Sequence, residues 1–142
     1  KKADNSHIGI ANEIEINNNG LKHPLYKNKD KKFNSPAFNF DEVVKIPDKG
    51  ICLASNKINK VQGLYFEVNK TKIWGLQYHP EITYEKMINL IEFRKERLIE
   101  SRKVFKDDTE VQKHIAFIKK EISVSDKEKR MLELKNWLNE LN

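Results

Sequence analysis

The chain has 142 residues, of which 38% are hydrophobic and 34% charged, and its formal net charge is +6. That length suits one domain with its own hydrophobic core, and no segment approaches the roughly 18 consecutive apolar residues of a membrane-spanning helix. The N-terminus has no Met and lacks the apolar core of a signal peptide, so we expect a fragment of a longer protein. Its single cysteine suits a reducing compartment. We therefore expect a cytoplasmic protein without a membrane partner.

The positive charge raises the question of nucleic-acid binding. The lysines are scattered over loops and over predicted helix faces that also carry glutamates, and aromatic residues do not alternate with them in any recognisable binding module. We therefore expect a solvated basic surface and no nucleic-acid partner. The alternative is a basic nucleic-acid binder, whose affinity would collapse as the salt concentration rises.

Before residue 82, short apolar segments are separated by turn residues, which is typical of β-strands. The turn at 17–20 consists of Asn and Gly, which tolerate positive φ. The connections at 47–50 and 69–71 are short enough to join neighbouring antiparallel strands. The pattern predicts strands over 7–16, 36–44, 51–54, 61–68 and 73–78, and a helical turn within 21–26 that Pro24 interrupts.

After residue 82 the apolar pattern becomes helical, with apolar side chains at i, i+3, i+4 and i+7 from Tyr84 onward. A second helix is predicted to start near Asp107, which has capping-box spacing with Glu110. A third is predicted to start at Ser125, with Glu128 three residues later. We expect this third helix to bury an apolar stripe formed by Met131, Leu134, Trp137, Leu138 and Leu141.

One predicted strand ends in a histidine that could carry chemistry. His79 is followed by Pro80, which ends a β-ladder because it has no N–H to donate. Glu81 is close enough in the chain for its carboxylate to orient the imidazole and to stabilise an imidazolium. Such a pair is the base and orienting half of a nucleophilic triad. A His-Pro-Glu sequence by itself is also an ordinary way for a strand to enter a loop.

The segment Gly75-Leu76-Gln77-Tyr78-His79-Pro80-Glu81 resembles the Gly-x-Gln-Phe/Tyr-His-Pro-Glu motif of class I glutamine amidotransferases. Segments 40–43, 46–47, 53–56 and 61–63 resemble, in the same order, the run before this motif in the glutaminase domain of GMP synthases. Segments 9–11, 23–25 and 136–138 resemble stand-alone bacterial GMP-synthase-like amidotransferases. The resemblance covers nearly the whole chain and is carried by several matches in one order.

The resemblance implies a Cys-His-Glu triad in which His79 and Glu81 are the catalytic residues of this chain. The family's nucleophilic cysteine lies on a sharp turn within Gly-x-Cys-x-Gly, and no such turn occurs here. Cys52 follows Gly50 but has no glycine after it, and its strand context predicts a small buried side chain rather than a reactive thiolate. We therefore expect the N-terminal half of the domain to be missing and the fragment alone to be inactive.

A second part of the resemblance concerns the substrate. The segment 38–41 aligns with the Ser-His-Gly-Asp of GMP synthases, whose backbone helps to hold glutamine, and of its side chains only Asp41 agrees. By this alignment Asn39 and Phe40 are candidate glutamine contacts. The alternative is that they form the edge of a core strand.

The fold that the resemblance implies is α/β, the C-terminal part of a flavodoxin-like class I glutamine amidotransferase fold with a β-rich first half and a helical C-terminal extension. We expect residues 1–105 to belong to the amidotransferase domain and residues 106–142 to form a helical extension packed on it. The implied partners are L-glutamine, the N-terminal half with its cysteine, and a synthase that accepts ammonia. No cofactor is implied.

Three other interpretations remain open: a non-catalytic interaction module, a γ-glutamyl hydrolase of the same fold, and the basic binder considered above. His7, His23 and His114 are too dispersed, and lack Cys, Asp or Glu at ligand spacing, to indicate a metal site. His114 lies among lysines of a predicted helix, so we expect it to be solvated.

Overall fold

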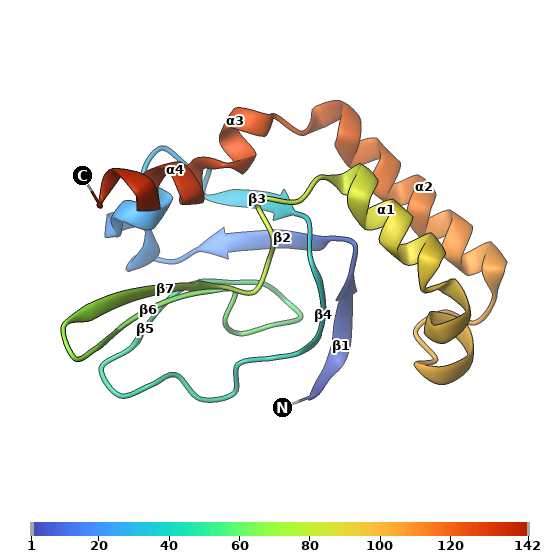
Figure 1. The fold of residues 1–142 in the computed structure, drawn as a ribbon, viewed down its shortest axis with the longest axis horizontal. Helices are drawn as coiled ribbons and strands as arrows, with labels where there is room; N and C mark the ends of the chain where they lie inside the picture. The colour runs from blue at the N-terminus through green and yellow to red at the C-terminus, as the bar shows by residue number, and fades with distance from the viewer. Residues whose placement is uncertain (1, 142) are drawn as a thin grey trace.

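The computed structural model of the chain describes residues 2–141. Figure 1 shows a β-rich first part followed by helices, with the last helix lying beside the segment that follows β2. The strands are β1 (Lys2–Ile8), β2 (Ala11–Ile16), β3 (Lys32–Ser35), β4 (Phe38–Asp41), β5 (Ile51–Ser55), β6 (Gly63–Val68) and β7 (Thr71–Leu76). The helical elements are η1 (Gly20–Lys22), η2 (Pro24–Tyr26), α1 (Tyr84–Phe93), η3 (Arg97–Ser101), α2 (Asp108–Val124), α3 (Lys127–Arg130) and α4 (Leu132–Asn139).

The strands form two antiparallel sheets. One pairs β1 with β4, and the other is curled and has the order β3-β2-β5-β6-β7. The hairpin between β6 and β7 closes on Asn69 and Lys70, whose φ angles are 49° and 68°. Two positive φ angles in a two-residue loop match the right-handed twist of the flanking strands. This hairpin delivers the chain to the candidate motif at the end of β7 (Figure 1).

The predicted strand over 7–16 is wrong in one respect, because it divides into β1 and β2, which belong to different sheets. The break lies at Gly9, whose φ of 85° is favourable only for glycine. A Cβ atom there would lie 2.6 Å from Cδ1 of Ile118 and 2.8 Å from Cδ1 of Ile91. The predicted strand over 36–44 is likewise shorter, since β4 covers only Phe38–Asp41. The last three predicted strands correspond to β5, β6 and β7 within two residues at each end.

Two hydrophobic clusters form the core. The first joins the end of β1 to α1 and α2, which lie side by side in Figure 1, and the second fills the curled sheet beneath η2. Burying each large aliphatic side chain contributes roughly 1.5–3 kcal/mol. The first cluster comprises Ile8, Ile10, Tyr84, Ile91, Leu98, Phe105, Val111, Ile115 and Ile118. The second comprises Ala11, Ile14, Ile16, Leu25, Tyr26, Ala37, Leu53, Ala54 and Tyr78.

The two later helix starts agree with the sequence to different degrees. The start near Asp107 is confirmed, because its carboxylate accepts a hydrogen bond from the backbone N–H of Glu110 at 2.9 Å. The third helix begins one residue later than expected, since Asp126 rather than Ser125 caps α3, and Met131 separates α3 from α4. Within residues 2–141, no helix combines the length and the apolar character that crossing a bilayer requires.

The most buried face of α4 lies beside the predicted one, whose Met131 and Leu134 are only half-buried. Trp137, Leu138 and Leu141 are 43%, 53% and 64% exposed, whereas Glu133 is fully buried and Asn136 is 9% exposed. The Asn136 amide donates to the carbonyls of Leu25 and Lys27, both at 2.9 Å. Hydrogen bonds to η2 and the segment after it therefore set the rotation of this helix, because buried polar groups need partners.

Candidate functional site

The candidate site is a tight turn that carries His79 and Glu81. The backbone N–H of Ile82 donates to the His79 carbonyl at 3.1 Å, which closes a four-residue β-turn with Pro80 in its second position. Proline is favoured there because its φ is already fixed near the required value. The turn places the side chains of His79 and Glu81 together, and Nδ1 of the imidazole lies 2.8 Å from Oε1 of the carboxylate.

The backbone before the turn is held by two further contacts. The N–H of Gln77 donates to the Gln62 carbonyl at 2.9 Å, which extends the pairing of β6 and β7 beyond Leu76. The N–H of His79 donates to the carbonyl of Pro36 at 2.7 Å. His79 therefore sits between the end of the curled sheet and the segment that joins β3 to β4.

The geometry gives the two imidazole nitrogens different roles. An ionised Glu81 only accepts hydrogen bonds, so the neutral ring carries its proton on Nδ1 and leaves Nε2 free to accept one. The side chains are 42% and 49% exposed, so the pair is open to another molecule or chain segment. The pair can act as a general base oriented by a carboxylate.

Tyr78 anchors the turn in the core from the other side of the chain. Its side chain is 2% exposed, and its hydroxyl donates to Oε1 of Glu133 at 2.7 Å and lies 3.0 Å from the hydroxyl of Tyr26. Burial raises the pKa of Tyr78 well above its ordinary value, and the neighbouring Tyr26 and Glu133 raise it further. The hydroxyl therefore stays protonated and donates to the carboxylate.

The same carboxylate is paired with a buried lysine. Nζ of Lys29 lies 2.9 Å from Oε2 of Glu133, and also donates to the Lys129 carbonyl at 2.8 Å. Burial lowers the pKa of Lys29, and Glu133 opposes that shift. A buried carboxylate needs such a partner because an isolated buried charge is very unfavourable.

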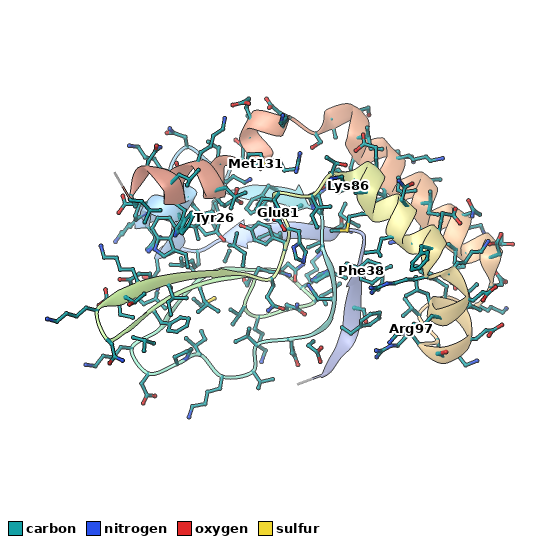
Figure 2. All side chains as sticks on the ribbon, in the orientation of Figure 1. Tyr26, Phe38, Glu81, Lys86, Arg97 and Met131 are labelled. Carbon is teal, nitrogen blue, oxygen red and sulfur yellow. The ribbon has the colours of Figure 1, made fainter. Side chains whose placement is uncertain are left out.

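Arg130 contacts the turn directly. Its Nη1 donates to the carbonyl of Pro80 and, at 2.7 Å, to the carbonyl of Ile82. Figure 2 shows Glu81, which lies between these two carbonyls in the chain, just below Met131 at the junction of the strands with the C-terminal helices. Hydrogen bonds from a charged donor are about twice as strong as those between neutral groups.

The two predicted substrate contacts lie on β4 but face different surroundings. Nδ2 of Asn39 donates to the Gln77 carbonyl at 2.7 Å, so the structure brings this residue to the motif. The ring of Phe40 packs against the first hydrophobic cluster, in an edge-on contact with Phe38, and Arg102 lies over it at 4.5 Å. Phe38 is labelled in Figure 2, where it lies on the side of the molecule that faces α1 and η3.

A second polar pair is buried beneath the site. Nε2 of His7 lies 2.8 Å from Nε2 of Gln62, and both side chains are almost fully excluded from solvent. Burial lowers the pKa of His7, against a smaller opposite effect of its hydrogen bond with the Ile10 backbone. The ring is therefore neutral and accepts the hydrogen bond of the Gln62 amide.

The remaining chemical candidates lie elsewhere. Burial raises the pKa of the Cys52 thiol, whose hydrogen bonds go to the carbonyls of Ala54 and Lys60. His114 was predicted to be solvated, and this is wrong: its Nε2 lies 2.6 Å from the Ile8 carbonyl and its ring packs on Phe105. Among residues 2–141 no three His, Cys, Asp or Glu side chains are placed to hold a metal ion.

The sequence interpretation missed the residues that hold the turn. Arg130, Glu133 and Asn136 recur every three residues, which is helical spacing, and all three make polar contacts with earlier parts of the chain. That polar stripe was a usable signal, but the apolar stripe beside it predicted a different buried face.

No protein-family model matches the chain. A γ-glutamyl-L-1-hydroxyisopropylamide hydrolase from Pseudomonas sp is 30% identical over 74 residues, which cover 52% of this chain and 25% of that protein. A glutamine-hydrolyzing GMP synthase subunit from Methanocaldococcus jannaschii is 37% identical over 71 residues, 49% of this chain and 36% of that protein. The chain thus spans only 25% and 36% of the lengths of these two relatives.

A solved structure extends the comparison over the whole fold. The crystal structure of a glutamine amidotransferase from Thermotoga maritima matches 98% of this chain and 52% of its own, with a TM-score of 0.64 and 17% identity. This confirms a mixed α/β fold that corresponds to part of an amidotransferase fold. The two sequence matches show partial homology to a class I glutamine amidotransferase domain of the GMP-synthase-like kind, and the structural match shows the fold. The family resemblance found in the sequence is therefore confirmed.

Proposed function

We propose that the intact protein is a glutamine amidotransferase in which His79 and Glu81 are the histidine and glutamate of the catalytic triad. The observation that carries the proposal is the 2.8 Å contact between Nδ1 of His79 and Oε1 of Glu81. It lies in a motif of the same pattern as the family's, in a chain homologous to glutamine-hydrolysing proteins. A chance His–Glu pair on the surface would not be expected to occur in this motif and in a homologous chain as well.

The proposed reaction hydrolyses the side-chain amide of glutamine. A cysteine thiol outside these residues loses its proton to Nε2 of His79, and its sulfur attacks the amide carbon. Collapse of the tetrahedral intermediate breaks the C–N bond, and the imidazolium gives its proton to the departing amide nitrogen, which leaves as ammonia. Water then cleaves the glutamyl thioester with His79 again acting as base, while Glu81 stabilises each imidazolium. Ammonia passes to an acceptor bound by a synthase partner.

The rest of the domain is part of the proposal. We assign residues 1–105 to the amidotransferase domain and residues 106–142 to its helical extension, with a flavodoxin-like fold for the intact, cytoplasmic protein. The backbone at Asn39 and Phe40 is proposed to contact glutamine, because Asn39 already adjoins the motif through the Gln77 carbonyl. Cys52 is a poor nucleophile where its thiol is half-buried and hydrogen-bonded, so residues 1–142 alone are expected to release no ammonia.

The test is ammonia release from glutamine by the full-length protein, with its synthase partner present, against its His79→Ala variant. We expect the variant to lose about 10²–10⁴-fold in kcat, the usual contribution of a general acid–base residue. His114→Ala is the matched control, because that half-buried imidazole contacts Phe105 and the Ile8 carbonyl, neither of which belongs to the turn. Equal activity in wild type and His79→Ala would reject the proposed role of His79.

A second candidate is hydrolysis of a substituted γ-glutamyl amide, which the activity of the Pseudomonas relative favours. The chemistry is the same, and only the leaving amine differs. Comparing release of ammonia from glutamine with release of alkylamine from a γ-glutamyl alkylamide decides between them. A higher kcat/KM for the alkylamide would favour the hydrolase.

A further inference from the structure

We propose that Arg130 is a positioning residue for the catalytic pair, acting through the backbone of the turn that carries His79 and Glu81. This inference rests on the proposed function for its consequence in catalysis, and its geometric part stands without it. Arg130 follows the turn by about fifty residues, with separations of 50 and 48 positions from Pro80 and Ile82. The contact therefore forms only when the chain folds, because the two segments are distant in the sequence.

The guanidinium fixes the backbone on both sides of Glu81. One nitrogen, Nη1, donates to the carbonyls of Pro80 and Ile82, the residues on either side of Glu81. The Pro80 carbonyl belongs to the peptide plane before Glu81, and the plane after it is held by the hydrogen bond from the Ile82 N–H to the His79 carbonyl. Those planes set the direction in which the Glu81 side chain leaves the backbone. That direction decides whether Oε1 reaches the imidazole.

The pair itself is too weak to provide this order. His79 and Glu81 are 42% and 49% exposed, and an exposed pair of this kind contributes little because water competes for both groups. Two exposed side chains with that attraction would sample several rotamers on a mobile turn. Charge-assisted hydrogen bonds from a half-buried guanidinium are stronger, because less water competes with them. The order of the pair therefore comes from the backbone beneath it.

A second anchor from the same C-terminal segment acts on the residue before His79. Glu133, which follows Arg130 by three residues, accepts the hydroxyl hydrogen bond of Tyr78 at 2.7 Å. The segment that includes α3 and α4 thus holds Tyr78 on one side of His79, and Pro80 and Ile82 on the other. Its position is in turn fixed by the Asn136 hydrogen bonds to the Leu25 and Lys27 carbonyls.

The test measures the tautomer of His79 by ¹H–¹⁵N NMR in the full-length protein at about pH 8.5, where an ordinary imidazole is neutral. In the wild type we expect the proton on Nδ1. In Arg130→Met we expect a substantial fraction with the proton on Nε2, because the carboxylate no longer holds Nδ1–H. Arg130→Lys keeps a cation that can reach the carbonyls, so it restores the wild-type spectrum in part. Lys129→Met is the matched control, since that lysine pairs with exposed Asp30 and its side chain does not touch the turn.

The same spectrum reports whether the fold survives. His7 pairs with Gln62 and His114 with the Ile8 carbonyl, not with Arg130, so both are expected to keep their wild-type signals in Arg130→Met. In kinetics, we expect kcat to fall about tenfold to a hundredfold, as for a small displacement of a catalytic group, with KM within about twofold, since only the reacting group is displaced.

An unchanged His79 tautomer in Arg130→Met would overturn the proposal, and so would equal changes at His7 and His114, which would mean a general loss of structure. Should Arg130→Met fail to fold, Arg130→Lys and Arg130→Gln are compared instead, and equal tautomer populations in wild type and Arg130→Gln would reject the positioning role. If the wild-type protein released no ammonia but the His79 tautomer still changed in Arg130→Met, the proposed function would be rejected and the positioning role would remain.

Discussion

The hydroxyl of Tyr78 donates to the buried carboxylate of Glu133 at 2.7 Å, across a separation of 55 residues. Tyr78 immediately precedes His79, and Glu133 lies in the first turn of α4. One hydrogen bond therefore ties the candidate catalytic turn to the C-terminal helices. Because Lys29 pairs with the other carboxylate oxygen, the bond is part of a buried network with both charges compensated.

Removing the Glu133 carboxylate should destabilise the fold strongly. Glu133→Ala leaves the Lys29 ammonium buried without its partner, and breaking a buried pair from one side costs about 3–5 kcal/mol. Urea unfolding of the full-length protein measures the loss. Glu128→Ala is the matched control, because its ion pair with Lys135 is exposed and we expect a loss of about 0–1 kcal/mol. Similar losses in the two variants would contradict the network.

Adding a methyl group at Gly9 should also destabilise the fold. Alanine there must adopt a φ of 85° and place its Cβ within 3 Å of Ile118 and Ile91 side-chain carbons. We expect Gly9→Ala to cost about 1–3 kcal/mol, mainly by overpacking the first cluster. At Gly75 the nearest contact of a Cβ would be 3.3 Å to a Leu64 side-chain carbon, so Gly75→Ala should cost less. The reverse order would contradict the packing described.

The stability should fall as the pH drops below about 6.5. Burial lowers the pKa of His7 below its ordinary value of 6.5, so the unfolded chain binds more protons than the folded one in that range. Stability from the neutral ring is fully present above 6.5 and is lost as the pH falls toward the folded-state pKa. Urea unfolding at a series of pH values measures this slope.

His23 should add to the same slope, since burial lowers its pKa as well, with Glu140 opposing and Lys72 assisting. Replacing His7 with Gln should reduce the slope, and replacing His23 with Gln should remove a further part. Histidines ordinarily titrate between about pH 5 and 7. If the unfolding free energy changed with pH equally in His7→Gln and wild type over that range, His7 would not be neutral and buried in the folded state.

Local sequence accounts for the parts of the structure that depend on near neighbours. The contact between His79 and Glu81 spans two residues, and Pro80 between them favours the turn that forms it. The Asp107 cap spans three residues. Each was predictable because the interacting groups lie within one turn of the chain, where residue type and spacing decide the geometry.

Contacts between distant segments were not predictable in the same way. The apolar side chains of Trp137, Leu138 and Leu141 indicated a buried stripe, yet α4 buries Glu133 and Asn136 because their partners lie on Tyr78, Lys29 and the η2 backbone. The break at Gly9 has a similar origin, since Ile91 and Ile118 approach it from two helices. Periodicity gives the faces of a helix but does not say which polar partners lie opposite each face.

His79 and Glu81 are proposed to act as one catalytic unit. A double-mutant cycle of His79→Ala, Glu81→Ala and the double variant, read as kcat/KM for ammonia release by the full-length protein, tests this most directly. Residues that act as a unit are non-additive, so we expect the double variant to lose little more than His79→Ala alone. Losses that multiply, or an active Glu81→Ala variant with wild-type kcat/KM, would contradict the proposal.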